Sequence, residues 1–77
     1  MNRIIGNMFK DIISHTNYTY DDIAKRVGLY GRQAVNHYVN HKKDEDWYYD
    51  DIKKWCKALG IDVIIFMDDV DRKRANP

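Results

Sequence analysis

The chain has 77 residues, which is enough for one small domain. Hydrophobic residues make up 44% and charged residues 32% of it, a balance typical of a folded globular domain and not of a disordered segment. The formal net charge is only +1, so total charge alone does not indicate a nucleic-acid partner.

Two helices are predicted in the first third of the chain. Apolar residues at helical spacing predict the first helix over about residues 3–15: Ile4, Ile5, Met8, Phe9, Ile12 and Ile13. A second helix is expected after Thr19, because Asp22 three residues later resembles a capping box. Gly28 is expected to end it, since glycine takes positive φ without a steric penalty.

Two further helices follow a short turn through residues 29–31. The first of them spans about residues 32–40, with Val35, Tyr38 and Val39 facing inward. A polar connector, residues 41–46, leads to the next helix over about residues 47–59, which Gly60 stops. Its N-cap is left open among three residues of the connector and first turn: Asp44, Asp46 and Asp50.

The stretch IDVIIFM, residues 61–67, is short, rich in β-branched residues and bounded by turn formers, so we predict a strand. A lone strand leaves its backbone groups unpaired, which predicts a homodimer joined by an antiparallel ribbon. The dimerisation residues are then Ile61, Val63, Ile64, Ile65 and Phe66. Alternatively, the segment extends the fourth helix or packs as an irregular arm. The domain is expected to span residues 1–67, followed by a flexible polar tail, residues 68–77.

Charge is unevenly distributed along the chain. Residues 1–43 hold seven Lys/Arg and three Asp, a net +4, whereas residues 44–77 hold six Lys/Arg and nine Asp/Glu, a net −3. This polarity predicts a positive field around the second and third helices and a negative field at the far end.

The stretch DDIAKRVGLYGRQAVNHYVN, residues 21–40, resembles the helix-turn-helix of Cro/lambda-repressor-type DNA-binding domains. MFKDII resembles the first helix of that family, and WYYDDIKKWCKALGIDVII resembles its C-terminal part. The resemblance implies a mainly α, four-helix domain of the lambda-repressor type, here with one C-terminal β-strand. Tyr30 and Gly31 stand where the family commonly has a capping Ser or Thr.

In this motif the second helix of the hairpin enters the major groove. The resemblance therefore implies base readout by Tyr30, Arg32, Gln33, Asn36 and His37. Phosphate contacts are expected from Lys25, Arg26, Lys42 and Lys43.

These expectations describe a small phage-related or bacterial transcriptional regulator that acts on double-stranded DNA as a homodimer, as a repressor by occupying its operator. The alternative is a protein-interaction module on the same scaffold, such as an antitoxin or a phage-encoded inhibitor, with the aromatic run of residues 47–49 as a contact surface. No catalytic pairing, metal-ligand spacing, cofactor motif or small-molecule site is evident, so we expect neither an enzyme nor a metalloprotein.

The remaining features favour a cytoplasmic protein. The single cysteine, Cys56, excludes an internal disulfide and is expected in the core. No apolar run approaches the ~20 residues that span a bilayer, and the first eleven residues lack the apolar region of a signal peptide.

Overall fold

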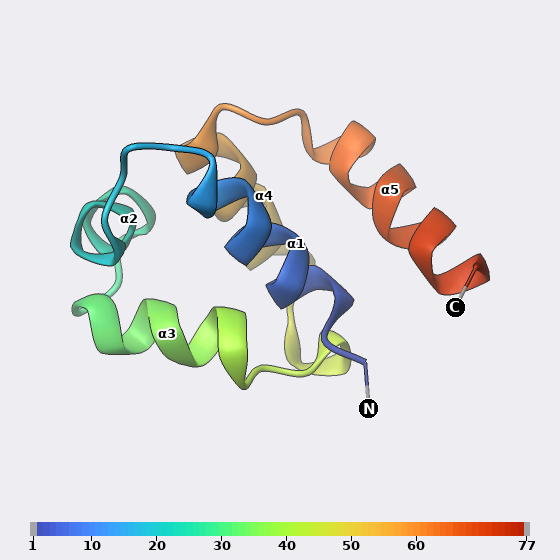
Figure 1. Ribbon diagram of the computed structural model, residues 1–77, viewed down its shortest axis with the longest axis horizontal. Helices are drawn as coiled ribbons and strands as arrows, with labels where there is room; N and C mark the ends of the chain where they lie inside the picture. The colour runs from blue at the N-terminus through green and yellow to red at the C-terminus, as the bar shows by residue number, and fades with distance from the viewer. Residues whose placement is uncertain (1, 77) are drawn as a thin grey trace.

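A computed structural model describes residues 2–76; the ends of the predicted domain and tail, residues 1 and 77, lie outside the described part. Residues 2–76 form five α-helices and one short 3₁₀-helix: α1 (Ile4–Ser14), α2 (Tyr20–Val27), α3 (Arg32–Asn40), η1 (Asp44–Asp46), α4 (Tyr49–Leu59) and α5 (Val63–Ala75). α1 packs against α3 and α5, and α4 packs against α2 and α5. The α2–α3 hairpin and α5 therefore lie at opposite ends of the molecule (Figure 1).

The predicted C-terminal strand is wrong, because the segment belongs to helix α5 and residues 2–76 contain no strand. The Asp62 side chain caps the helix by accepting from the backbone N–H of Ile64 at 2.8 Å. Phe66 and Val70, four residues apart, are buried on one face of the helix. These tertiary contacts outweigh the β-propensity of the isoleucine-rich stretch. The helix continues to Ala75, through most of the segment expected to be a polar tail.

The helices α2 and α3 and the turn between them form as their local chemistry predicts. Thr19 accepts from the N–H of Asp22, and the Asp22 carboxylate accepts from the N–H of Thr19, which completes the capping box. This backbone hydrogen bond lowers the pKa of Asp22 because it favours the ionised carboxylate. Gly28 ends α2 in the left-handed conformation with φ 93°.

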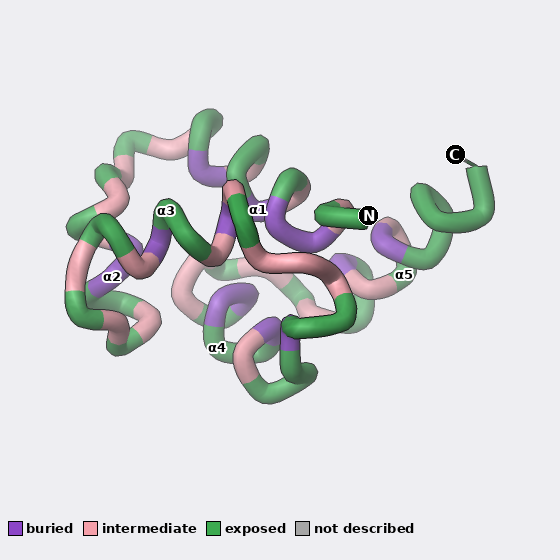
Figure 2. The backbone as a smooth tube through the Cα atoms, turned by 90° about the horizontal axis from the view of Figure 1, so that it is seen from below, coloured by how far each residue is buried: buried purple, intermediate pink, exposed green. Residues whose placement is uncertain are grey.

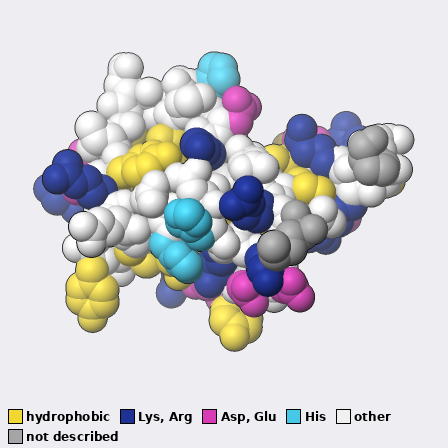
Figure 3. All heavy atoms as spheres, turned by 60° about the horizontal axis from the view of Figure 1, so that its bottom comes forward, with side chains coloured by type: hydrophobic (Ala, Val, Ile, Leu, Met, Phe, Trp, Pro, Cys, Tyr) yellow, Lys and Arg dark blue, Asp and Glu magenta, His cyan; other side chains and the backbone are white. Residues whose placement is uncertain are grey.

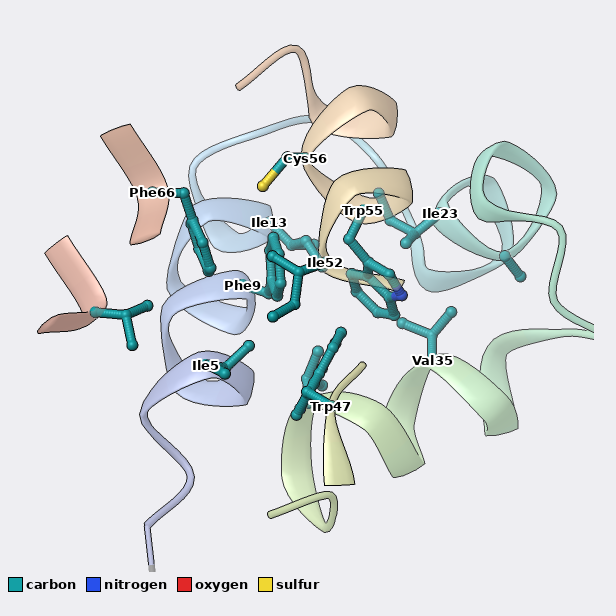
Figure 4. Close-up of a cluster of buried hydrophobic side chains, with 13 residues drawn as sticks. Ile5, Phe9, Ile13, Ile23, Val35, Trp47, Ile52, Trp55, Cys56 and Phe66 are labelled. Atoms are coloured by element: carbon teal, nitrogen blue, oxygen red, sulfur yellow. The ribbon is translucent and has the colours of Figure 1, made fainter. Parts of the chain in front are cut away.

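Aromatic rings join the helices in one core (Figure 4). Phe9 of α1 stacks on Phe66 of α5, with ring centroids 4.3 Å apart. The same ring lies 5.3 Å from Trp47 and 5.2 Å from Trp55. Cys56 is buried as expected, and burial raises the pKa of its thiol to about 11. Phe9 therefore contacts aromatic rings from α5, from α4 and from the segment just before α4.

The fourth helix begins later than predicted. Trp47 precedes it and is buried in the core, while η1 occupies part of the predicted connector. Tyr48 is its N-cap residue, but no side chain caps the helix. The three aromatic residues 47–49 therefore differ in burial: Trp47 is buried, whereas Tyr48 and Tyr49 are exposed.

α1 and α3 cross closely at Gly6. A Cβ atom on Gly6 would lie 3.0 Å from the carbonyl oxygens of Tyr38 and Val39. Such a contact is shorter than normal packing allows, and its partners are backbone atoms that cannot rotate away. Glycine at this position lets α1 approach the end of α3.

Asp44 joins three distant parts of the chain. One of its carboxylate oxygens accepts from the N–H of Ile5 at 2.8 Å and so caps α1. The other lies 3.6 Å from an Arg74 guanidinium nitrogen near the end of α5. The Asp44 side chain is only 9% exposed and that of Arg74 is 42% exposed, so the carboxylate is shielded from water on its own side of the ion pair.

We expect Asp44→Ala to reduce the free energy of unfolding by about 1–3 kcal/mol, because it leaves the Ile5 N–H without its partner. Asp44→Asn keeps a capping oxygen and removes only the charge, so its loss should be smaller and should match that of Arg74→Ala. Urea unfolding of the three variants measures these differences. Equal losses for Asp44→Ala and Asp44→Asn would show that the cap contributes nothing.

Candidate nucleic-acid interface

The turn between α2 and α3 is held by backbone hydrogen bonds. The N–H groups of Gly28 and Leu29 both donate to the carbonyl of Ala24 at 2.8 Å. Gly31 is the N-cap residue of α3, and no side chain caps the helix there. The Ala34 N–H donates to the Gly31 carbonyl at 3.1 Å, whereas no hydrogen bond within residues 2–76 engages the N–H groups of Arg32 and Gln33. The positive end of the helix dipole is therefore open to an anion at these two groups.

α3 has one buried and one exposed side (Figure 2). Val35 and Val39 are fully buried, and Tyr38 is half-buried against Trp47 and Trp55. The predicted base-reading residues share the exposed side or the turn before it: Tyr30, Arg32, Gln33, Asn36 and His37. Helix periodicity thus brings the predicted set together on one surface.

A shallow hollow lies at the start of α3. Its lining combines the turn, the first residues of α3 and one residue of α2: Asp21, Tyr30, Gly31, Arg32, Gln33 and Ala34. Tyr30 projects from the turn and is fully exposed. The hollow places a phenol, a guanidinium and a carboxamide around the open helix terminus.

The predicted phosphate contacts fall into different environments. Arg26 donates to the carbonyl of Ala58 at 3.3 Å, and its guanidinium lies 4.2 Å from the ring centre of Tyr18. It therefore connects α2 to the end of α4. Lys42 lies over the Tyr38 ring at 4.7 Å, beside the end of α3. Lys25 is exposed and Lys43 half-buried, and no hydrogen bond or ion pair within residues 2–76 engages either side chain.

Two basic residues of α1 and its N-cap approach α3, and the sequence interpretation missed them. Lys10 donates to the Asn40 side-chain oxygen at 2.6 Å, and Arg3 donates to the Asn40 backbone carbonyl. The spacing of seven residues puts Arg3 and Lys10 on one helical face, which is a detectable signal. Only the tertiary crossing of α1 and α3 shows that this face adjoins the candidate interface.

Two exposed histidines, His37 and His41, lie at the C-terminal end of α3 on this surface. The rings of His37 and His41 stack with centroids 6.1 Å apart. Figure 3 shows histidine and basic side chains spread across the middle of this face, with acidic side chains toward its margin. The surface is suited to a polyanion that also offers hydrogen-bonding edges.

Comparison of the chain with protein-family models, curated proteins and solved structures finds no match. Among the described helices, none has the length and apolar character required to cross a membrane.

Proposed function

We propose that the protein binds double-stranded DNA sequence-specifically through α3 and regulates transcription, as a repressor that acts by occupying its site. The observation that carries this proposal is the two-sided character of α3. Its inner side is anchored by Val35 and Val39, which are fully buried, while its outer side carries only hydrogen-bonding side chains. A helix held rigidly in this way is suited to insertion into the major groove.

The exposed groups match the chemistry of base edges. Arginine donates in a bidentate manner to guanine O6 and N7, and glutamine pairs with adenine N6 and N7, so Arg32 and Gln33 supply both kinds of readout. Tyr30 and His37 lie at either end of this pair, where they can contact bases or the backbone. The open N–H groups at the start of α3 favour a phosphate oxygen.

Lys25, Lys42 and Lys43 remain the proposed phosphate contacts. Arg26 is left out, because its guanidinium is engaged by Ala58 and Tyr18. With about three phosphates neutralised per subunit, the log–log dependence of affinity on salt has a slope of roughly −3.

We expect Arg32→Ala to weaken specific binding by about 1–3 kcal/mol and to relax the preference at one base position. The control is Lys54→Ala, which removes the same charge from an exposed site on α4. Affinities for a random duplex pool at about 50 and 200 mM salt, followed by sequencing of the bound DNA, measure both effects. Equal losses for the two variants with an unchanged preference would reject base readout by Arg32.

We further propose a homodimer formed through α5 and the adjoining side of α1, in place of a β-ribbon. Of the predicted dimerisation residues, Phe66 is buried in the core and Ile61 and Val63 are half-buried. Ile64 and Ile65 remain 68% and 59% exposed.

A groove beside α5 complements these isoleucines. It runs between α1 and α5, and its lining combines apolar, polar and charged side chains: Ile4, Asn7, Met8, Asp11, Ile12, Asp69 and Lys73. α5 and the groove beside it thus carry exposed isoleucines, apolar groove residues and charges of both signs, which is what a self-complementary two-fold interface requires. Since α5 and the α2–α3 hairpin lie at opposite ends, this dimer leaves both α3 helices uncovered.

We expect Ile64→Lys to produce monomers with unchanged helix content, because a desolvated lysine opposes association and an exposed position tolerates it. The control is Tyr48→Lys, which places the same charge at an exposed hydrophobic residue far from α5 in sequence. Sedimentation velocity over a range of concentrations measures the change. Wild-type protein that stays monomeric throughout would reject the dimer.

The exposed Tyr48 and Tyr49 favour a protein partner as the second candidate function. They follow the acidic η1, so this surface is suited to a partner with a basic rim around an aromatic pocket. Absence of duplex binding even at low salt would select this function over the first.

A further inference from the structure

A relay of two hydrogen bonds runs from α1 along the exposed side of α3. The Lys10 ammonium donates to Oδ1 of Asn40 at 2.6 Å. Nδ2 of Asn40 then donates to Oδ1 of Asn36 at 2.7 Å. Asn36 is one of the proposed base-reading residues, and Lys10 lies on a different helix.

The chemistry of the first residue fixes the direction of the whole relay. A lysine ammonium has three donors and no acceptor, so Asn40 must turn its oxygen toward Lys10. The Asn40 amide nitrogen then faces Asn36 and requires an acceptor, which only the Asn36 oxygen supplies. Within residues 2–76, no hydrogen bond engages the NH₂ group of Asn36.

The backbone supports this arrangement. Arg3 donates to the Asn40 carbonyl, so Asn40 is held through both its side chain and its main chain. Gly6 keeps α1 close enough to the end of α3 for Lys10 to reach Asn40. In water such exposed hydrogen bonds exchange readily with solvent, but they strengthen when a bound duplex excludes water.

We propose that Lys10 is a positioning residue that sets the base preference of Asn36, acting through Asn40; this rests on the proposed DNA binding. Asn36 presents a donor, so it favours guanine, whose O6 and N7 are both acceptors in the major groove. It disfavours cytosine, which offers only an N4 donor there.

The test is selection of bound sequences from a random duplex pool by wild-type protein and four variants. Asn36→Ala identifies the position that Asn36 reads, because the preference is lost there alone. Lys10→Met should relax the same position, reducing its guanine-to-cytosine ratio by about tenfold. Lys10→Arg retains the donors and should keep the preference.

Asn40→Asp tests the direction of the relay. A carboxylate accepts from Lys10 and also from Asn36, so Asn36 must reverse its amide and present its oxygen. The preference should then invert toward bases with a donor, cytosine N4 or adenine N6. The added negative charge weakens all sequences alike, so the inversion is measured as a ratio at one position.

Three results would overturn the proposal. Lys10→Met that weakens every sequence equally, with an unchanged preference, would make Lys10 a phosphate contact only. In the free protein, Lys10→Met should shift the NMR signals of both side-chain amides. A shift for Asn40 without one for Asn36 would show that the relay stops at Asn40. Wild-type protein that binds no duplex would reject the proposed function itself, a result distinct from the other two.

Discussion

We expect Phe9→Ala to remove a large part of the protein's free energy of unfolding. Truncating a buried phenylalanine costs about 3–5 kcal/mol, and a 77-residue domain has about 4–12 kcal/mol in total. Phe9 lies at the high end of such costs, because its ring contacts Trp47, Trp55 and Phe66 from three other parts of the chain. Its removal leaves a cavity bordered by rigid rings that cannot close around it.

Urea unfolding followed by tryptophan fluorescence measures this loss, since both tryptophans adjoin Phe9 and report on its neighbourhood. Phe9→Leu is the control, because it keeps an apolar side chain at the centre of the core and should cost less. If the two variants unfold at the same urea concentration, the aromatic contacts do not contribute to stability in the way we describe.

The second large effect is expected for Gly6→Ala, a loss of about 1–3 kcal/mol from overpacking. Alanine is the better helix former by about 1 kcal/mol. Stability is therefore lost only if the steric contact at the α1–α3 crossing costs more than this gain. The added methyl group meets the carbonyl oxygens of Tyr38 and Val39 at 3.0 Å. α1 and α3 must therefore separate, which also lengthens the Lys10–Asn40 hydrogen bond.

Gly31→Ala is the matched control, because nothing lies within 4 Å of the added Cβ atom. Its free energy of unfolding should stay close to that of the wild type. Thermal unfolding followed by circular dichroism compares the two variants. A Gly6→Ala protein more stable than the wild type would mean that helix propensity outweighs the crossing and that the α1–α3 contact yields easily.

Features encoded by neighbouring residues were predictable from the sequence. The capping box of Thr19 and Asp22 and the end of α2 at Gly28 depend on residues within one helical turn of each other. The exposed side of α3 followed in the same way, because the 3.6-residue period places Gln33 and His37 opposite the buried Val35.

The C-terminal segment was not predictable from its local composition. Its apolar period continues through Val63, Phe66, Met67 and Val70, across the acidic pair at residues 68–69, which resembled a boundary. The deciding contact, Phe66 on Phe9, joins opposite ends of the chain. Two contacts at the candidate interface were not predictable from local sequence either. The contacts of Arg26 with Ala58 and of Lys10 with Asn40 depend on tertiary packing.

The stack of Phe9 on Phe66 also determines when the protein can fold during its synthesis. α1 leaves the ribosome before α5, and its inner face has no complete partner until α5 has emerged. The α2–α3 hairpin needs only its own short turn and can form earlier. The nascent chain therefore carries α1 with an incompletely covered apolar face until α5 has been made, and the core closes only then.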